Sequence, residues 1–127
     1  MILCDTNILI EFYKNTSNVT QELRHIGPNQ LAISVVTQAE LYFGALNKGE
    51  LQKIKHHLSL LHYFPLDTAT SNTFLRLMER YTLSHTLNIP DALIASTALV
   101  HNVELYTLNK KDFHFISNLR LYQPATY

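Results

Sequence analysis

The chain has 127 residues, of which 46% are apolar, with three glycines and four prolines. This length and composition exclude a disordered or collagen-like chain and predict one compact domain over residues 1–127. Ten basic and ten acidic residues give a formal charge of zero. A broad electrostatic attraction to nucleic acid is therefore excluded, and any such contact must be local.

The sequence shows no sign of secretion or of membrane insertion. Cys4 is the single cysteine, which excludes an internal disulfide and fits a reducing compartment. The apolar run at the amino terminus is broken by Asp5 and is not a signal peptide. No run of about 20 apolar residues could form a membrane span. These features predict a cytoplasmic protein without a membrane partner.

The amino terminus combines a strand pattern with an acid. Met1–Cys4 is a short apolar run that leads into Asp5, Thr6 and Asn7, a pattern typical of a buried strand bounded by polar residues. Asp5 then falls at the carboxyl end of a strand, where open α/β sheets bind ligands. The alternative interpretation is a helix N-cap, because the helical run Ile8–Lys14 follows.

The rest of the chain alternates between helical and strand patterns. Apolar spacings of three and four, together with breaks at proline and glycine, define the expected boundaries. In order, the predicted elements are a helix over Val19–Ile26, a strand over Leu31–Ile33, a helix from Val35 to about Asn47, a helix over Leu51–Leu61, a strand over Tyr63–Leu66, a helix opened by Asp67 and Thr68 that runs to about Leu87, a helix over Asp91–Val100, a strand over Glu104–Thr107, a turn or short helix over Leu108–Phe113 and a strand over Leu119–Tyr122. This alternation predicts an α/β sandwich of about five short, mostly parallel strands with helices on both faces.

Local patterns also predict where some side chains lie. Pro65 confines its strand to an edge of the sheet, because proline cannot donate a ladder hydrogen bond. Asp67 is expected to cap the helix that follows it. Spacings of three, four and three predict one buried stripe on the helix from Val35, made of Val36, Ala39, Phe43 and Leu46.

Two further acids lie on helices. Glu40 sits beside that stripe, four residues before Gly44, and can reach inward past the helix. Its alternative role is in a capping box with Thr37, in which the glutamate bonds back to the cap amide. Asp91 opens a nearly all-apolar helix, which puts its charge at the rim of the core. The alternative for Asp91 is a simple interaction with the helix dipole.

In a parallel sheet these acids share one edge. Asp5 and Thr107 end strands, while Glu40 and Asp91 lie on helices associated with that edge. Carboxylates gathered without basic partners repel one another, and burying them unpaired costs on the order of several kcal/mol. A divalent cation removes this cost, and oxygen-only ligands favour Mg²⁺ or Mn²⁺ over zinc. Such an ion polarises a phosphate oxygen and activates water, which predicts phosphoryl chemistry.

Four segments in this order resemble the PIN-domain family, and within it the VapC-type ribonuclease toxins, over essentially the whole chain. They are Asp5–Ile8, Ser34–Leu41 with Gly44, Ile89–Ala95 and Leu105–Phe113. The resemblance implies a PIN-like three-layer sandwich and an endoribonuclease that depends on Mg²⁺ or Mn²⁺. It also implies the toxin of a toxin–antitoxin pair, acting on an RNA substrate as a homodimer and neutralised by a cognate antitoxin protein.

The resemblance further implies roles for single residues. Asp5, Glu40 and Asp91 match the family's three acidic positions and are expected to be catalytic. Asp5 and Asp91 would hold the metal, directly or through water. Glu40 would either ligate it or take a proton from the attacking water. The supporting polar positions, which would orient carboxylates or metal-bound water, are matched by Asn7, Ser34 and Thr107.

The chain departs from the family at the fourth acidic position. The family often has Thr-x-Asp there, whereas this chain has Thr107, Leu108 and Asn109. Asparagine keeps an oxygen ligand but loses the charge. Asp112 is the alternative source of that carboxylate and is carried as a fourth catalytic candidate, which leaves open whether one or two metals bind.

Other functions remain open at this stage. Phosphatases that form an aspartyl-phosphate also begin with a strand that ends in Asp, but their second Asp would fall at Asn7. A receiver-type domain would use Asp67 and Lys110 and would leave Glu40 without a role. A non-catalytic PIN-like binding protein is compatible with the lost charge at Asn109.

Overall fold

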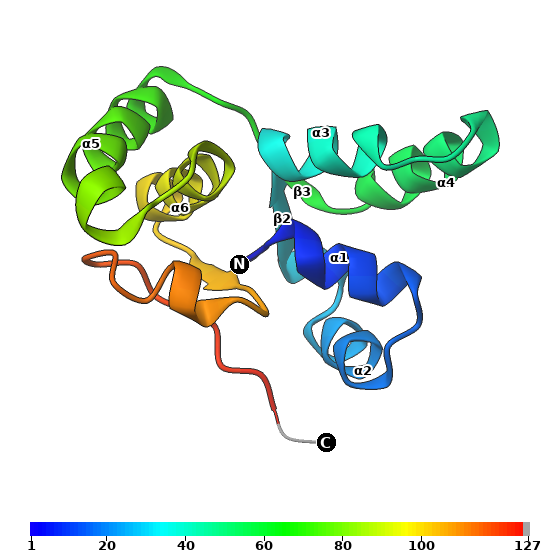
Figure 1. Cartoon of the computed structure of the whole chain (residues 1–127). Coiled ribbons are helices and arrows are strands. Elements are labelled where there is room, and N and C mark those ends of the chain that lie inside the picture. The colour runs from blue at the N-terminus through cyan, green and yellow to red at the C-terminus, as the bar shows by residue number, and fades with distance from the viewer. Residues whose placement is uncertain (126–127) are drawn as a thin grey trace.

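The computed structural model describes residues 1–125 and contains one parallel sheet with helices on both faces (Figure 1). Within those residues the strands are β1 (Ile2–Cys4), β2 (Leu31–Ser34), β3 (His62–Phe64) and β4 (Glu104–Tyr106). Their order across the sheet is β3-β2-β1-β4, and every neighbouring pair is parallel. The carboxyl ends of all of them therefore meet at one edge, which confirms the α/β class.

The predicted fifth strand is reduced to a single pairing. Leu121 forms an isolated parallel bridge with Leu105, supported by a bond from the Tyr122 N–H to the Leu105 carbonyl at 2.8 Å. The pairing cannot extend far in either direction. Asn118 has a positive φ of 69° on one side, and Pro124 has no N–H to donate on the other. The expectation of about five strands is corrected to four plus this bridge in residues 1–125.

Helices connect the strands throughout the described part of the chain. They are α1 (Thr6–Tyr13), α2 (Ser17–Ile26), α3 (Val35–Phe43), α4 (Lys48–Leu58), α5 (Thr68–His85) and α6 (Ile89–His101), with 3₁₀ turns at Pro28–Gln30 and Lys110–Asp112. None of these helices in residues 1–125 is long and apolar enough to cross a bilayer.

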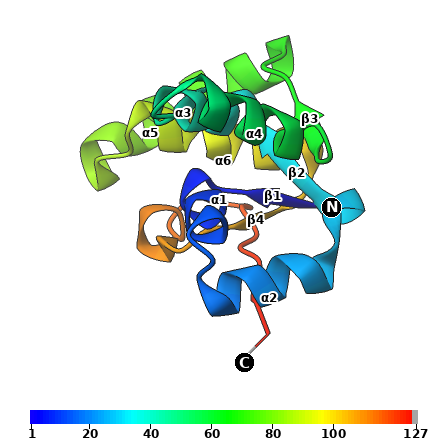
Figure 2. The same ribbon diagram turned by 90° about the vertical axis from the view of Figure 1, so that its right-hand side faces the viewer.

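Successive strand residues point to opposite faces of the sheet and contribute to two separate hydrophobic cores. Leu3 and Leu105 point to one face and pack with α5 and α6, whereas Cys4 and Tyr106 point to the other and pack with α1, α2 and α4. Figure 1 shows α5 and α6 on one side of the strands and α1, α2 and α4 on the other, and Figure 2 looks onto the molecule from the side of α1, α2 and α4. Both faces of the sheet are thus buried, as the apolar strand patterns predicted.

The long helix predicted over residues 35–47 is wrong in its length. Helix α3 ends at Phe43, and α4 begins as a separate helix at Lys48. The side chain of Asn47 accepts from the Glu50 N–H at 2.9 Å and caps α4. Asparagine is a strong N-cap, and here it starts a new helix instead of ending the previous one.

The buried stripe predicted for that helix is also wrong at Ala39, Phe43 and Leu46, which are exposed, whereas Val36 is partly buried against the core. Phe43 is 93% exposed and Leu46 is 85% exposed. The residues of α3 that are buried are Thr37 and Leu41. Apolar spacing predicted that apolar side chains of this helix face the core. Thr37 also faces inward, where its hydroxyl lies 3.1 Å from that of Thr6 on another helix.

Two local predictions in the second half of the chain are confirmed. Strand β3 lies at an edge and ends just before Pro65. The side chain of Asp67 accepts from the Thr70 N–H at 2.8 Å and caps α5.

Several boundaries differ by one to three residues. The strand predicted over Tyr63–Leu66 is His62–Phe64, α5 ends at His85, and β4 ends at Tyr106. Helix α6 begins at Ile89, ahead of the predicted Asp91, because the Asn88 side chain caps it.

Candidate active site

Asp5 lies directly after β1, and each of its two carboxylate oxygens accepts a hydrogen bond. One oxygen accepts from the Thr6 N–H and the other accepts from the Thr107 hydroxyl, each at 2.8 Å. The side chain is 6% exposed. Asp5 is the N-cap of α1, so the capping interpretation holds for one oxygen. Capping does not account for the second oxygen, which meets a residue that follows β4.

The pKa of the Asp5 carboxyl is raised above its ordinary value. Burial is the largest cause. The hydrogen bonds from Thr107 and Thr6 oppose it, whereas the negative charges of Glu40 and Asp112 add to it. Asp5 therefore has carboxylates near it that come from distant parts of the sequence.

Glu40 reaches across to α1 and does not bond back to the start of its own helix. Its Oε1 accepts from the Thr6 hydroxyl at 2.6 Å. The N-cap of α3 is Ser34, whose hydroxyl accepts from the Thr37 N–H at 3.2 Å. Since α3 begins at Val35, Glu40 already lies in the second turn, and the capping box is wrong.

Asp91 lies in the first turn of α6 and is tied to the cap residue Asn88. The Asp91 N–H donates to Asn88 Oδ1 at 2.9 Å, and Asn88 Nδ2 donates to Asp91 Oδ2 at 3.2 Å. Burial, followed by the charges of Asp5 and Asp112, raises the pKa of Asp91 to about 6, and Glu40 adds to the shift. A helix dipole alone would lower this pKa, so the neighbouring acids and burial dominate.

Asn109 and Asp112 occupy different places. The charge of Asp112 raises the pKa of both Asp5 and Asp91. Asn109 is exposed, and its backbone N–H donates to Thr107 Oγ1 at 3.0 Å. Asp112 thus contributes charge to the site, whereas Asn109 supports the hydroxyl that holds Asp5. We call Asp5, Glu40, Asp91 and Asp112 the acidic cluster.

The three predicted supporting residues all make contacts at this edge of the sheet. Thr107 bonds to Asp5, and Ser34 caps α3, which carries Glu40. Asn7 Oδ1 accepts from the Leu108 N–H at 3.3 Å and so ties α1 to the segment after β4. These contacts fix the elements around the acids. Whether Asn7, Ser34 and Thr107 also orient a metal-bound water stays a prediction.

No basic side chain balances the acidic cluster within residues 1–125. The ion pair found in that range joins Lys14 and Glu11 at 3.6 Å. The charges that shift the pKa of Asp5 and Asp91 are those of other acids. The cluster therefore carries uncompensated negative charge, as expected from the sequence.

The donor set fits a hard divalent cation, because carboxylates supply only oxygen ligands. However, no three Asp, Glu, His or Cys side chains in the described residues are positioned to hold an ion together. Mg²⁺ commonly keeps several waters and binds through one or two carboxylates. The arrangement therefore fits a partly hydrated ion, and it does not form a closed cage.

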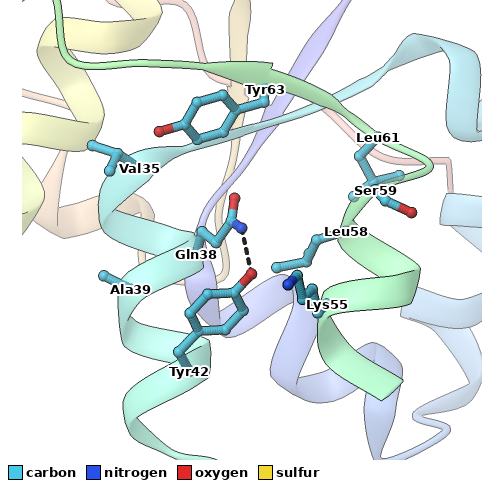
Figure 3. Close-up of a pocket in the computed structure, with 9 residues that line it drawn as sticks. All are labelled: Val35, Gln38, Ala39, Tyr42, Lys55, Leu58, Ser59, Leu61 and Tyr63. Atoms are coloured by element: carbon cyan, nitrogen blue, oxygen red, sulfur yellow. Dashed lines mark hydrogen bonds between the residues drawn. The ribbon is translucent and has the colours of Figure 1, made fainter. Parts of the chain in front are cut away.

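Two hollows border α3 on different faces. One, of about 740 Å³, lies between α1, α3 and α4 and includes Glu40 in its wall. The other, of about 520 Å³, is lined from α3, α4 and β3; there Gln38 Nε2 donates to the Tyr42 hydroxyl at 2.6 Å (Figure 3). Of the two, only the hollow beside Glu40 adjoins the acidic cluster.

Sequence reasoning missed two threonines of this site. Thr6 bonds to Asp5 and Glu40, and Thr37 is fully buried against Thr6. Thr6 was within the motif Asp5, Thr6 and Asn7, so its position was a usable signal. Thr37 drew notice only through the capping box, which is wrong, because its side-chain partner Thr6 lies 31 residues away.

Comparisons with known proteins agree with this fold. The family model for the PIN domain matches residues 2–117. The chain is 33% identical over 124 residues to Ribonuclease VapC10 of Mycobacterium tuberculosis, which covers 94% of this chain and 91% of that protein. It is 30% identical over 128 residues to Ribonuclease VapC1 of Rickettsia felis, with 94% and 93% covered.

Solved structures give the same result. A toxin–antitoxin complex from Klebsiella pneumoniae aligns with a TM-score of 0.80 and 33% identity, covering 94% of this chain and 95% of that one. VapBC2 from Rickettsia felis, bound to a DNA fragment from its promoter, aligns with a TM-score of 0.78 and 28% identity, covering 96% and 98%. The family match spans the segments that carry Asp5, Glu40, Asp91 and Asp112, and the chain belongs to the PIN-domain family.

Proposed function

We propose that this protein is an endoribonuclease that cleaves RNA phosphodiester bonds with a divalent cation, Mg²⁺ or Mn²⁺, and that it acts as the toxin of a toxin–antitoxin pair. The observation that supports this most strongly is the acidic cluster: four carboxylates from distant segments interact at the carboxyl edge of the sheet without a basic partner in residues 1–125. The relatives named as VapC ribonucleases support the choice of RNA.

The carboxylates differ in burial and in how firmly hydrogen bonds fix them. Asp5 is buried and fixed by two donors, and Asp91 is half-buried and bonded to Asn88, so these two are the proposed metal ligands. Glu40 is exposed and is the proposed ligand or acceptor for the proton of the attacking water. When bound, the cation supplies positive charge, polarises a phosphate oxygen and activates water.

A neutral chain also needs a way to approach a polyanion. The acidic cluster by itself repels a phosphodiester, so the proposed cation is required for binding as well as for chemistry. Lys110 and Lys111 lie in the 3₁₀ turn that carries Asp112 and are exposed. Lys110 donates to Gln123 Oε1 at 2.8 Å, which leaves Lys111 as the proposed contact to the RNA backbone.

The antitoxin is proposed to cover the hollow beside Glu40. The walls of that hollow are largely apolar, and exposed apolar surface of this kind marks protein interaction sites. Apolar side chains that line it are Ile10, Phe12, Leu41, Leu46 and Ile54. A segment of the antitoxin seated there would lie beside Glu40 and obstruct RNA. The homodimer stays a proposal, which light scattering of the purified protein tests. A toxin that cuts RNA would act in the cytoplasm, where its substrate is.

Cleavage of a defined RNA by purified protein tests this function. With Mg²⁺ or Mn²⁺ the wild type is expected to cut the RNA, and excess EDTA is expected to stop it. Asp91→Ala is expected to be inactive. Asp67→Ala is the matched control, because it also removes an aspartate from the start of a helix, but one outside the acidic cluster. Equal cleavage by Asp91→Ala and wild type would contradict the proposal.

A non-catalytic PIN-like binding protein is the second candidate. Asn109 in place of an acid and the lack of a three-ligand set in the described residues favour it. Calorimetry with Mn²⁺, with and without RNA, separates the two, since no metal binding in either case favours the binder. The receiver-type alternative is not supported, because Asp67 caps α5 and is not among the charges that shift Asp91.

A further inference from the structure

Thr6 contacts two of the four acids in the acidic cluster. Its backbone N–H donates to Asp5 Oδ1 at 2.8 Å, and its hydroxyl lies 2.6 Å from Glu40 Oε1. Thr6 is the first residue of α1, next to Asp5, whereas Glu40 lies 34 residues further along, on α3. One residue therefore links the two elements that carry these acids.

Three hydroxyl groups, those of Ser34, Thr37 and Thr6, form a chain of hydrogen bonds that runs from the end of β2 to Glu40. Ser34 Oγ lies 3.5 Å from Thr37 Oγ1, and Thr37 Oγ1 lies 3.1 Å from Thr6 Oγ1. Ser34 and Thr37 are both fully buried. Ser34 Oγ already accepts from the Thr37 N–H at 3.2 Å, so its own proton is left to donate to Thr37.

The direction of this chain of hydrogen bonds follows from the chemistry of its end group. A carboxylate only accepts, and each hydroxyl has one proton. The proton of Thr6 therefore points to Glu40, and Thr6 in turn accepts from Thr37. Thr37 then accepts from Ser34. With this direction every hydroxyl both accepts and donates, and the final bond is a short, charge-assisted one.

Glu40 depends more than the other acids on a hydrogen-bond donor that fixes its side chain. Its side chain is exposed and long, so it loses rotamer entropy when it is fixed. Asp5 and Glu40 also repel each other, since the charge of Glu40 raises the pKa of Asp5. Without a donor between them, the Glu40 carboxylate would turn away from Asp5 into solvent.

We propose that Thr6 is the positioning residue that holds the Glu40 carboxylate beside Asp5, and that the buried Ser34 and Thr37 hydroxyls orient it. The proposal rests on the proposed metal-dependent ribonuclease for its effect on rate. Its structural part, the place of the Glu40 carboxylate, stands independently of that function.

Four variants test the chain of hydrogen bonds. Thr6→Val removes the hydroxyl but keeps the shape and the N–H to Asp5, and Thr6→Ser restores a hydroxyl. Thr37→Val removes the hydroxyl that orients Thr6 and serves if Thr6→Val does not fold. Thr16→Val is the matched control, because Thr16 Oγ1 donates to Glu11 Oε1 at 3.1 Å, a similar pair outside the acidic cluster.

The first measurements need no RNA: crystal structures of the variants, and Mn²⁺ binding by calorimetry. Thr6→Val is expected to lose the Glu40 carboxylate from its place and to bind Mn²⁺ about tenfold more weakly, the factor that corresponds to one charge-assisted hydrogen bond. Thr37→Val is expected to show about a threefold loss. Thr6→Ser and Thr16→Val are expected to match the wild type.

Kinetics supply the second measurement. Thr6→Val is expected to lower kcat about tenfold while the KM for RNA stays within about twofold, because Thr6 acts on a carboxylate and not on the RNA. An unmoved Glu40 in crystals of Thr6→Val, or Mn²⁺ binding equal to that of Thr16→Val, would overturn the proposal. If the wild type cuts no RNA, the proposed function fails, and the position of Glu40 in the crystals still decides the role of Thr6.

Discussion

Two buried carboxylates in this molecule serve different ends. Glu22 on α2 is 1% exposed, and its Oε2 accepts from the Tyr122 hydroxyl and the Ala125 N–H, each at 2.8 Å. Asp5 is 6% exposed and also accepts two hydrogen bonds. Burial and hydrogen bonding are thus common to both.

Other acids lie close to Asp5, and Glu22 is not one of them. The charges of Glu40 and Asp112 raise the pKa of Asp5, and Glu22 is not among the charges that act on Asp5 or Asp91. Glu22 ties the last described residues to α2, which is a structural task. Asp5 is held where other acids gather, which costs stability and suits a cation. What marks Asp5 as the candidate functional carboxylate is therefore the gathering of other acids around it, because burial and hydrogen bonding are shared with Glu22.

The largest expected effect is on cleavage by Asp5→Ala and Asp91→Ala. Both are expected to lose activity by at least about 100-fold, beyond the 10–100-fold typical of losing a residue that only supports a metal ligand. Both are expected to stay folded, by circular dichroism. Glu22→Gln is the matched control and is expected to cut RNA at the wild-type rate per folded molecule. Loss of cleavage in folded Glu22→Gln would break the distinction.

Glu22→Gln is expected to lower the free energy of unfolding by about 1–3 kcal/mol, because a buried donor loses its charged acceptor. Urea denaturation measures this. Tyr122→Phe removes only the hydroxyl that donates to Glu22 and is expected to cost about 1 kcal/mol. If Glu22→Gln is as stable as the wild type, the Glu22 carboxylate does not anchor the segment from Tyr122 to Ala125.

A divalent cation is expected to stabilise the acidic cluster. At a Mn²⁺ concentration 100 times its Kd, the free energy of unfolding should rise by about 2.7 kcal/mol. The Tm should therefore increase by several degrees in scanning calorimetry. Asp91→Ala is expected to show much less of this increase, and Glu22→Gln is expected to show all of it. The same increase in Asp91→Ala would remove Asp91 from the metal site.

The smallest expected effect is on the pH dependence of the metal-free protein. The pKa of Asp91 is raised to about 6 from an ordinary value of 3.8, so the folded state holds its proton more tightly than the unfolded state. Stability is therefore greatest below about pH 4 for this group and falls as the pH rises through 6. In EDTA, the stability of Asp91→Asn should not fall as the pH rises through 6. Its Tm at pH 7 is therefore expected to exceed that of the wild type by a few degrees.

Several features of the fold could be read from short-range patterns. The apolar run before Asp5 predicted β1, Pro65 predicted an edge strand, and Asp67 predicted the cap of α5; all three are present. Each depends on backbone geometry within a few residues, where local chemistry decides. The alternation of helix and strand predicted a parallel sheet for the same kind of reason, since parallel strands need a crossover.

The misjudged features depend on partners far along the chain. Thr37 is buried where it meets Thr6, 31 residues away, whereas Phe43 on the same helix is exposed. Glu22 is buried because its donors lie 100 and 103 residues away. A periodicity argument sees only the polarity of such residues, so the spacing of apolar residues gave no sign that Thr37 or Glu22 is buried.

By itself the sequence determined the strand-end place of Asp5, the parallel sheet and the family, because these follow from local patterns and from motifs in a fixed order. It left open whether Asn109 or Asp112 completes the acidic site. Only the tertiary structure decided that the charge of Asp112 acts on Asp5 and Asp91 while Asn109 supports Thr107. The physical reason is that charges act through space: the sequence predicted a turn over Leu108–Phe113, but only the folded chain sets where Asp112 in that turn lies relative to Asp5 and Asp91.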